Sequence, residues 1–151
     1  MPIDTTTYIL LSKVKAQLNS SERFLKAVRG WTSNILVDIK PPIPGTPYSY
    51  RVLMEILDGK CVTLKVLEPE EQIKADIHVS MDLDTYEKML KGELGSTAAT
   101  LKGKVKISGN TIELLKRRDC LEVLNTVMRN MLFHGGAIRA LLPFLRREFT
   151  Y

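Results

Sequence analysis

The chain has 151 residues, 44% of them hydrophobic and 26% charged, which favours one folded domain with a buried core and argues against intrinsic disorder. No apolar run approaches the roughly 20 residues of a membrane span, and the N-terminus lacks the pattern of a signal peptide, so we expect a soluble, cytoplasmic protein. The net charge of +5 is compatible with an acidic partner, either nucleic acid or an anionic membrane.

The N-terminal part predicts two helices. Threonines at 5–7 can cap a first helix that ends near Asn19. Ser20 or Ser21 then begins a second helix, which Gly30 ends. The apolar side chains that recur at helical intervals in the first helix are Tyr8, Leu11 and Leu18.

Strands follow. Residues 32–40 alternate apolar and polar side chains as a strand does, and the proline-rich residues 41–47 form a loop. Residues 48–68 predict a hairpin, because two alternating segments flank Asp58-Gly59, a type I′ turn sequence. Residues 75–81 alternate again, and we expect them to form a third consecutive antiparallel strand.

The period then changes to that of a helix. Asp82 or Asp84 can cap a helix, with Glu87 three residues after Asp84 as in a capping box, and Gly92 ends this helix. Residues 96–103 form a short helix or turn, and 103–108 form the last strand, with Val105 and Ile107 inward and Lys104 and Lys106 outward.

The C-terminal part is predicted to be helical. A long apolar periodicity starts at Thr111 and is bent near Asp119, and Gly135-Gly136 interrupts it. Residues 137–149 form a final amphipathic segment with arginines beside its apolar face. We expect this segment to dock on its own domain as a lid, on a second copy of the chain as a homodimer, or on an anionic membrane.

Glycines mark the boundaries of the segment 92–110. Gly92 follows a helix, Gly109 leaves the last strand, and Gly103 opens that strand, where a side chain would crowd the preceding turn. A phosphate-binding loop needs a different glycine spacing, which the sequence lacks.

Residues 75–110 (ADIHVSMDLDTYEKMLKGELGSTAATLKGKVKISGN) resemble the signature of the sterol carrier protein lipid-binding domain. That family has a strand opening with Ala-Asp, a short helix with an aromatic residue, and a closing GKxKxxGN. The spacing from Gly92 to Gly103 to Gly109 matches without a gap. The sequence departs from the family at Ser96, where proline is frequent, and at Thr100-Leu101, where the family has an aromatic pair.

The resemblance implies an α+β fold with a five-stranded, largely antiparallel sheet, covered on one face by helices, and an apolar tunnel between sheet and helices. The expected ligand is a fatty acid, an acyl-CoA, a sterol or an isoprenoid lipid. We assign residues 1–134 to this domain, with an extra N-terminal helix, and 135–151 to the C-terminal helix.

An amphipathic sheet with helices standing slightly off it leaves an apolar cavity, for which about 300–1,000 Å³ is typical of ligand sites. Apolar residues of the covering helices and the last strand are the predicted wall, although for any single one of them ordinary core is the favoured interpretation. The predicted ligand-binding residues are Tyr86, Met89, Leu90, Leu94, Leu101, Val105, Ile107, Ile112 and Leu115. Flexible methionines suit an adaptable pocket and an irregular core alike.

Other functions have weaker support. The sequence lacks GxSxG, HExxH and CxxC, so we predict no catalytic residues, no metal, no cofactor and no enzymatic activity. Cys61 and Cys120 are expected to be buried free thiols. A row of lysines from Lys102 to Lys106 suggests a phosphate track, but aromatics total 7%, and we do not expect nucleic acid as a partner. The leading hypothesis is a lipid-binding or lipid-transfer protein; the alternative is an accessory interaction module of a lipid-metabolising enzyme complex.

Overall fold

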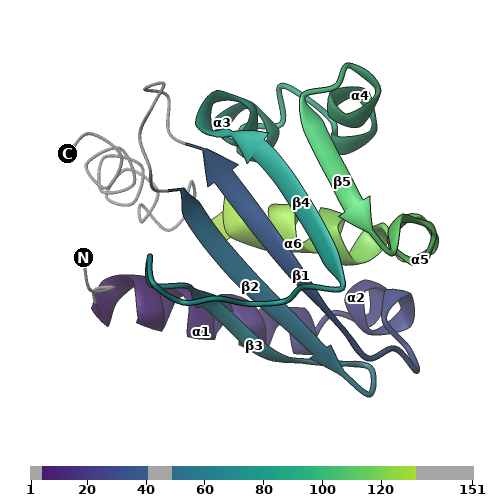
Figure 1. The fold of residues 1–151 in the computed structure, drawn as a ribbon. Helices are drawn as coiled ribbons and strands as arrows, with labels where there is room; N and C mark the ends of the chain where they lie inside the picture. The colour runs from purple at the N-terminus through teal and green to yellow at the C-terminus, as the bar shows by residue number, and fades with distance from the viewer. Residues whose placement is uncertain (1–4, 41–48, 132–151) are drawn as a thin grey trace.

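The structure is a computed structural model that describes residues 5–40 and 49–131 (Figure 1). Its helices and strands follow the predicted order along the chain. Their bounds are α1 Thr5–Asn19, α2 Glu22–Ala27, β1 Ser33–Lys40, β2 Tyr50–Leu57, β3 Lys60–Val66, β4 Ile77–Asp82, α3 Leu83–Leu90, α4 Ser96–Leu101, β5 Val105–Gly109, α5 Thr111–Lys116 and α6 Asp119–Arg129.

Side-chain caps start two of the helices. The Ser21 hydroxyl accepts a hydrogen bond from the backbone N–H of Phe24 at 3.2 Å, which confirms the predicted start of α2. The Asp82 carboxylate accepts from the N–H of Thr85 at 2.7 Å and caps α3. The predicted capping box of Asp84 and Glu87 is therefore wrong, because the helix begins before Asp84 and Glu87 lies buried in it.

The sheet has the strand order β3-β2-β1-β4-β5. Three of its pairings are antiparallel and β1 pairs with β4 in parallel, so the largely antiparallel sheet is confirmed. The β2–β3 hairpin turns at Asp58 and Gly59, both with positive φ, as a type I′ turn requires. However, β4 is not a third consecutive antiparallel strand, because it lies beside β1 and not beside β3.

Residues 67–76 make this change of position by crossing the outer face of the sheet, in front of β2 and β1 in Figure 1. Leu67, with Ile73 and Ala75 beside it, covers Leu36 and Leu53, which point outward from β1 and β2. A parallel pair needs such a long connection, since a tight turn joins only antiparallel strands. The crossover thus gives β1 apolar neighbours on both faces.

The inner face of the sheet carries the main core. Alternate residues of the strands point to this face, and α1 and α6 lie behind it in Figure 1. Asn19 fixes the end of α1 against β3, because its side chain donates to the Cys61 carbonyl at 2.8 Å and accepts from the Cys61 N–H at 2.9 Å. Cys61 and Cys120 are both free and buried, as predicted.

The predicted bend near Asp119 is a break between two helices. Arg117 lies at the C-terminal end of α5, and α6 starts at Asp119. The Arg117 guanidinium lies 5.0 Å above the Trp31 ring and donates to the carbonyls of Ala27 and Arg29, at 3.1 Å each. These contacts hold α5 against the turn that follows α2.

Two glycines have different reasons for their positions. The crowding predicted at Gly103 is wrong: a Cβ there would have nothing within 4 Å, and its positive φ of +73° is the constraint. Gly109, with φ +89°, is the crowded position, because a Cβ would overlap the backbone carbonyl oxygen of Asp76. The close approach of β5 to the start of β4 depends on this missing side chain.

Several predictions concern residues outside the described ranges. These are the proline-rich loop at 41–47, the Gly135-Gly136 interruption, the C-terminal helix within 135–151 and its roles as lid, dimer contact or membrane anchor.

Candidate functional site

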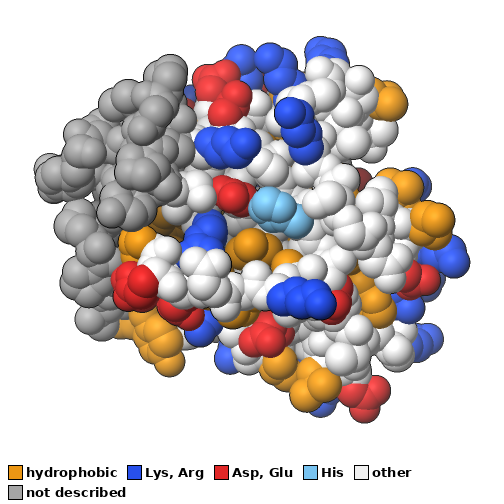
Figure 2. Space-filling view, in the orientation of Figure 1, with side chains coloured by type: hydrophobic (Ala, Val, Ile, Leu, Met, Phe, Trp, Pro, Cys, Tyr) orange, Lys and Arg blue, Asp and Glu red, His pale blue; other side chains and the backbone are white. Residues whose placement is uncertain are grey.

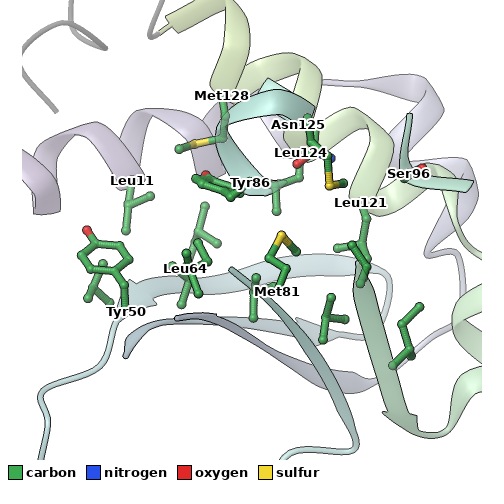
Figure 3. Close-up of a pocket in the computed structure, with 18 of the residues that line it drawn as sticks. Leu11, Tyr50, Leu64, Met81, Tyr86, Ser96, Leu121, Leu124, Asn125 and Met128 are labelled. Atoms are coloured by element: carbon green, nitrogen blue, oxygen red, sulfur yellow. The ribbon is translucent and has the colours of Figure 1, made fainter. Parts of the chain in front are cut away.

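A cavity of about 110 Å³ lies between the inner face of the sheet and the helices α1, α3, α4 and α6 (Figure 3). Strand residues form its floor and helix residues its roof. The floor consists of Val37, Ile39, Tyr50, Val52, Leu64, Val66, Val79, Met81, Val105 and Ile107, and the roof of Leu10, Leu11, Tyr86, Met89, Ser96, Thr100, Leu121, Leu124, Asn125 and Met128.

The wall is apolar with a few hydrogen-bonding groups. Among its described residues none carries a charge at neutral pH, and the polar ones are two tyrosines with Ser96, Thr100 and Asn125. In Figure 3 the rings of Tyr50 and Tyr86 stand on opposite sides of the cavity, one from the sheet and one from α3. Burial raises the pKa of Tyr86 to about 12, which indicates a poorly solvated surrounding for its hydroxyl.

Three methionines contribute to this wall. Met81 comes from β4, Met89 from α3 and Met128 from α6, and each is 7% exposed. Unbranched methionine side chains change rotamer at low cost, so they let a cavity adapt its shape. The volume of the cavity is below the range predicted for a ligand site, and these side chains are its adjustable part.

Six of the nine predicted wall residues are buried or partly buried. Tyr86, Met89, Val105 and Ile107 line the cavity. Leu90 is 1% exposed and belongs to close-packed core, and Leu94 packs against that core; neither is part of the wall.

The other three predicted residues lie outside the cavity wall. Leu101 is 83% exposed, Ile112 69% and Leu115 55%, so none of them lines the cavity. Leu101 is the last residue of α4 and lies on the solvent side of that helix. The buried residue of α4 is Ala99. In α5 the buried residue is Leu114, because the break at Arg117 prevents the apolar periodicity of α6 from continuing through α5.

Sequence reasoning missed the contributions of α1 and α6. Leu10 and Leu11 come from α1, and Leu121, Leu124 and Met128 come from α6. The i, i+3 and i+7 spacing of the α6 residues was visible as a helical stripe, but the sequence did not show that this stripe covers the sheet. Asn125 lies next to that stripe. A polar side chain at such a position favours a cavity over close-packed core, and this was the signal in the sequence.

On the outer face of the sheet, away from the cavity, His78 and Asp38 form a polar pair. His78 Nε2 lies 3.5 Å from Asp38 Oδ2, across the parallel pair of β4 and β1. His78 thus lies on the polar face of its strand, and Figure 2 shows this face with the histidine near its centre. Within residues 5–40 and 49–131 no group of three histidine, cysteine or acidic side chains could hold a metal ion.

The sequence model of the SCP-2 sterol transfer family matches residues 11–122. The chain belongs to this family. The crystal structure of a sterol carrier protein 2 is 26% identical, with a TM-score of 0.68 over 83% of this chain and 98% of that one. A conserved hypothetical protein from Thermus thermophilus is 24% identical, with a TM-score of 0.66 over 85% and 90% of the two chains.

A third solved structure, the palmitated SCP2L2 protein from Aedes aegypti, is 14% identical, with a TM-score of 0.54 over 80% of this chain and 95% of that one. It shares the fold with this SCP-2 family member. Among curated proteins none matches the chain. In the part of the chain that the structure describes, no helix combines the length and the apolar character needed to cross a membrane.

Proposed function

We propose that this SCP-2 family protein binds a hydrophobic ligand non-covalently in the cavity and transfers it between sites. The candidate ligands are fatty acids, acyl-CoA, sterol-like compounds and isoprenoid lipids. The observation that carries this proposal is an uncharged, largely apolar cavity between sheet and helices, in the fold of a sterol transfer family. No catalytic step is part of the mechanism.

Binding would be driven by transfer of apolar surface out of water. Each methylene buried in the cavity contributes about 0.8 kcal/mol. A long chain needs more room than about 110 Å³, so we propose that Met81, Met89 and Met128 change rotamer as the ligand enters. The palmitated relative, which has the same fold, supports a fatty acyl chain as one ligand.

The polar groups of the wall would orient the ligand. Ser96 and Thr100 from α4 and Asn125 from α6 provide uncharged donors and acceptors beside apolar surface. They suit a hydroxyl, ester or carbonyl oxygen.

Unpaired, buried Cys61 and Cys120 support a reducing compartment such as the cytoplasm.

The test compares Met89→Trp with Leu101→Trp by titration with a fluorescent fatty acid and a fluorescent sterol. Tryptophan at Met89 should fill the cavity and weaken binding by at least tenfold. Leu101→Trp is the matched control: it adds the same ring to a side chain that is 83% exposed and should bind like wild type. Thermal melts check that both variants are folded.

Equal affinity of the two variants would place the ligand elsewhere. If neither the variants nor wild type take up any lipid, and native mass spectrometry finds none after purification, the proposal fails and the accessory interaction module takes its place.

A further inference from the structure

Three large exposed apolar side chains that do not line the cavity lie at the two ends of the sheet margin formed by β5. Leu101 lies just before this strand, and Ile112 and Leu115 lie just after it, one helical turn apart on α5. Figure 2 shows separate hydrophobic groups near α4 and near α5 on this side of the molecule, with basic side chains near each. Exposed aliphatic side chains at both ends of one sheet edge allow the whole edge to lie flat on an apolar or interfacial surface.

The same stretch contains the excess charge of the protein. Residues 101–118 include six of the 22 basic residues and one of the 17 acidic ones, so this stretch carries a charge of +5, equal to the net charge of the whole chain. Its single acidic residue, Glu113, is already paired with Arg117 at 3.2 Å and Lys116 at 3.8 Å.

The other four cations of this stretch have no such acidic partner among the described residues. Lys102, Lys104, Lys106 and Arg118 are exposed, and none forms an ion pair within 4 Å among the described residues. Lys104 and Lys106 point toward the outer face, where Lys106 lies opposite Ser80 of β4. Lys104 and Lys106 thus lie along β5 between its two apolar ends, while Arg118 lies beyond α5.

We propose that this margin, made of Leu101, Ile112 and Leu115 with Lys102, Lys104, Lys106 and Arg118, docks on an anionic lipid bilayer. The leucines and isoleucine would enter the interface between headgroups and acyl chains, while the lysines reach the lipid phosphates and carboxylates. Nucleic acid would use the cations but has no role for three exposed aliphatic side chains. The proposal concerns a surface separate from the cavity and holds whatever ligand the cavity takes.

Vesicle flotation with the full chain tests this surface. Wild type should bind vesicles of phosphatidylcholine with about one third phosphatidylserine, should bind phosphatidylcholine alone far less, and should be released by salt. A Lys102→Gln, Lys104→Gln, Lys106→Gln variant should lose about a hundredfold in affinity, because each lysine near an anionic surface contributes about fivefold. Leu101→Ser with Ile112→Ser and Leu115→Ser should lose about tenfold or more.

Matched controls change similar residues elsewhere. Leu57 and Val62, on the β2–β3 hairpin, are 56% and 44% exposed, and Leu57→Ser with Val62→Ser should bind vesicles like wild type. Replacing exposed Lys13 and Lys60 by glutamine should reduce affinity by less than the triple lysine change. Circular dichroism and thermal melts confirm that each variant is folded.

Depth of insertion gives a second readout. Leu101→Trp fluorescence should shift to shorter wavelength and be quenched by brominated phosphatidylcholine in mixed anionic vesicles, whereas Leu57→Trp should not be. Trp31, the only native tryptophan, is 7% exposed and gives a constant background.

Four results would overturn the proposal. Wild type that fails to bind anionic vesicles excludes it. The triple variant Arg139→Gln, Arg146→Gln, Arg147→Gln could lose vesicle binding while the margin variants retain it. That result assigns the membrane contact to the C-terminal segment. Apolar variants with unchanged vesicle affinity, together with tight binding of a DNA oligomer, assign the cations to nucleic acid. A dimer in light scattering that Leu101→Ser dissociates assigns the margin to a second copy of the chain.

Discussion

Replacing Gly109 by alanine should destabilise the fold more than the same change at Gly103. The new Cβ at Gly109 would overlap the Asp76 carbonyl oxygen and come within 3.2 Å of the Ile77 Cα. Neither atom is free to retreat, because the Asp76 carbonyl accepts a hydrogen bond from the Asn110 N–H at 3.0 Å and Ile77 pairs with Gly109 in the sheet. The strand β5 would have to separate from β4 at this end.

The magnitude follows from three contributions. Alanine in a left-handed conformation costs about 1–2 kcal/mol, and the reduced freedom of the unfolded chain returns about 0.4–1 kcal/mol. At Gly103 nothing else opposes the Cβ, so Gly103→Ala should cost about 1 kcal/mol. At Gly109 the overlap adds about 1–3 kcal/mol, for a total of about 2–4 kcal/mol.

Urea denaturation of the two variants and wild type measures this difference at constant m-value. Gly103→Asn is a useful control, because asparagine tolerates positive φ, and it should cost less than Gly103→Ala. A Gly109→Ala variant as stable as Gly103→Ala would refute the argument that the close approach of β4 and β5 requires glycine.

Two further predictions concern stability. Arg117→Lys should lower the free energy of unfolding by about 1–3 kcal/mol, because lysine cannot reproduce the contacts of the guanidinium with Trp31 and two carbonyls; urea denaturation measures it. Burial raises the pKa of Cys61 to about 11 and that of Cys120 to about 12, so thiols ionise first in the unfolded chain and stability should fall as pH rises from about 9. Denaturation midpoints at pH 8 and 10 measure this fall, which Cys120→Ala should reduce; an equal fall in that variant would contradict it.

The local elements were predictable because each has its own sequence signal. The hairpin followed from alternation around Asp58-Gly59, and the start of α2 from Ser21. The order of the strands in the sheet was harder to predict, because the path of the crossover at 67–76 decides whether β4 lies beside β3 or beside β1. One signal was present: Ile35, Leu36 and Val37 are apolar in succession, which is typical of a central strand buried on both faces.

The cavity was predicted in position but not in its full composition. The family-like segment 75–110 supplies only part of the wall. The rest comes from β1, β2 and β3 and from α1 and α6, which lie at the two ends of the described chain. Where these helices lie on the sheet is a tertiary property that periodicity does not contain. The prediction that Ile112 and Leu115 of α5 are wall residues has the same origin, because the spacing of apolar residues along a helix does not show whether they face the sheet or the solvent.

Burial alone also fails to separate cavity wall from close-packed core. Met89 and Leu90 are neighbours in α3 and are 7% and 1% exposed, yet only Met89 borders the cavity. Larger side chains should distinguish them, because Met89→Trp can extend into free volume, whereas Leu90→Trp forces packed neighbours apart at a cost of about 1–3 kcal/mol. Thermal melts without ligand should therefore show Leu90→Trp markedly less stable than Met89→Trp. If both lose the same stability, the space next to Met89 is not available to a side chain, and a ligand would have to create its own room by displacing α3 or α6.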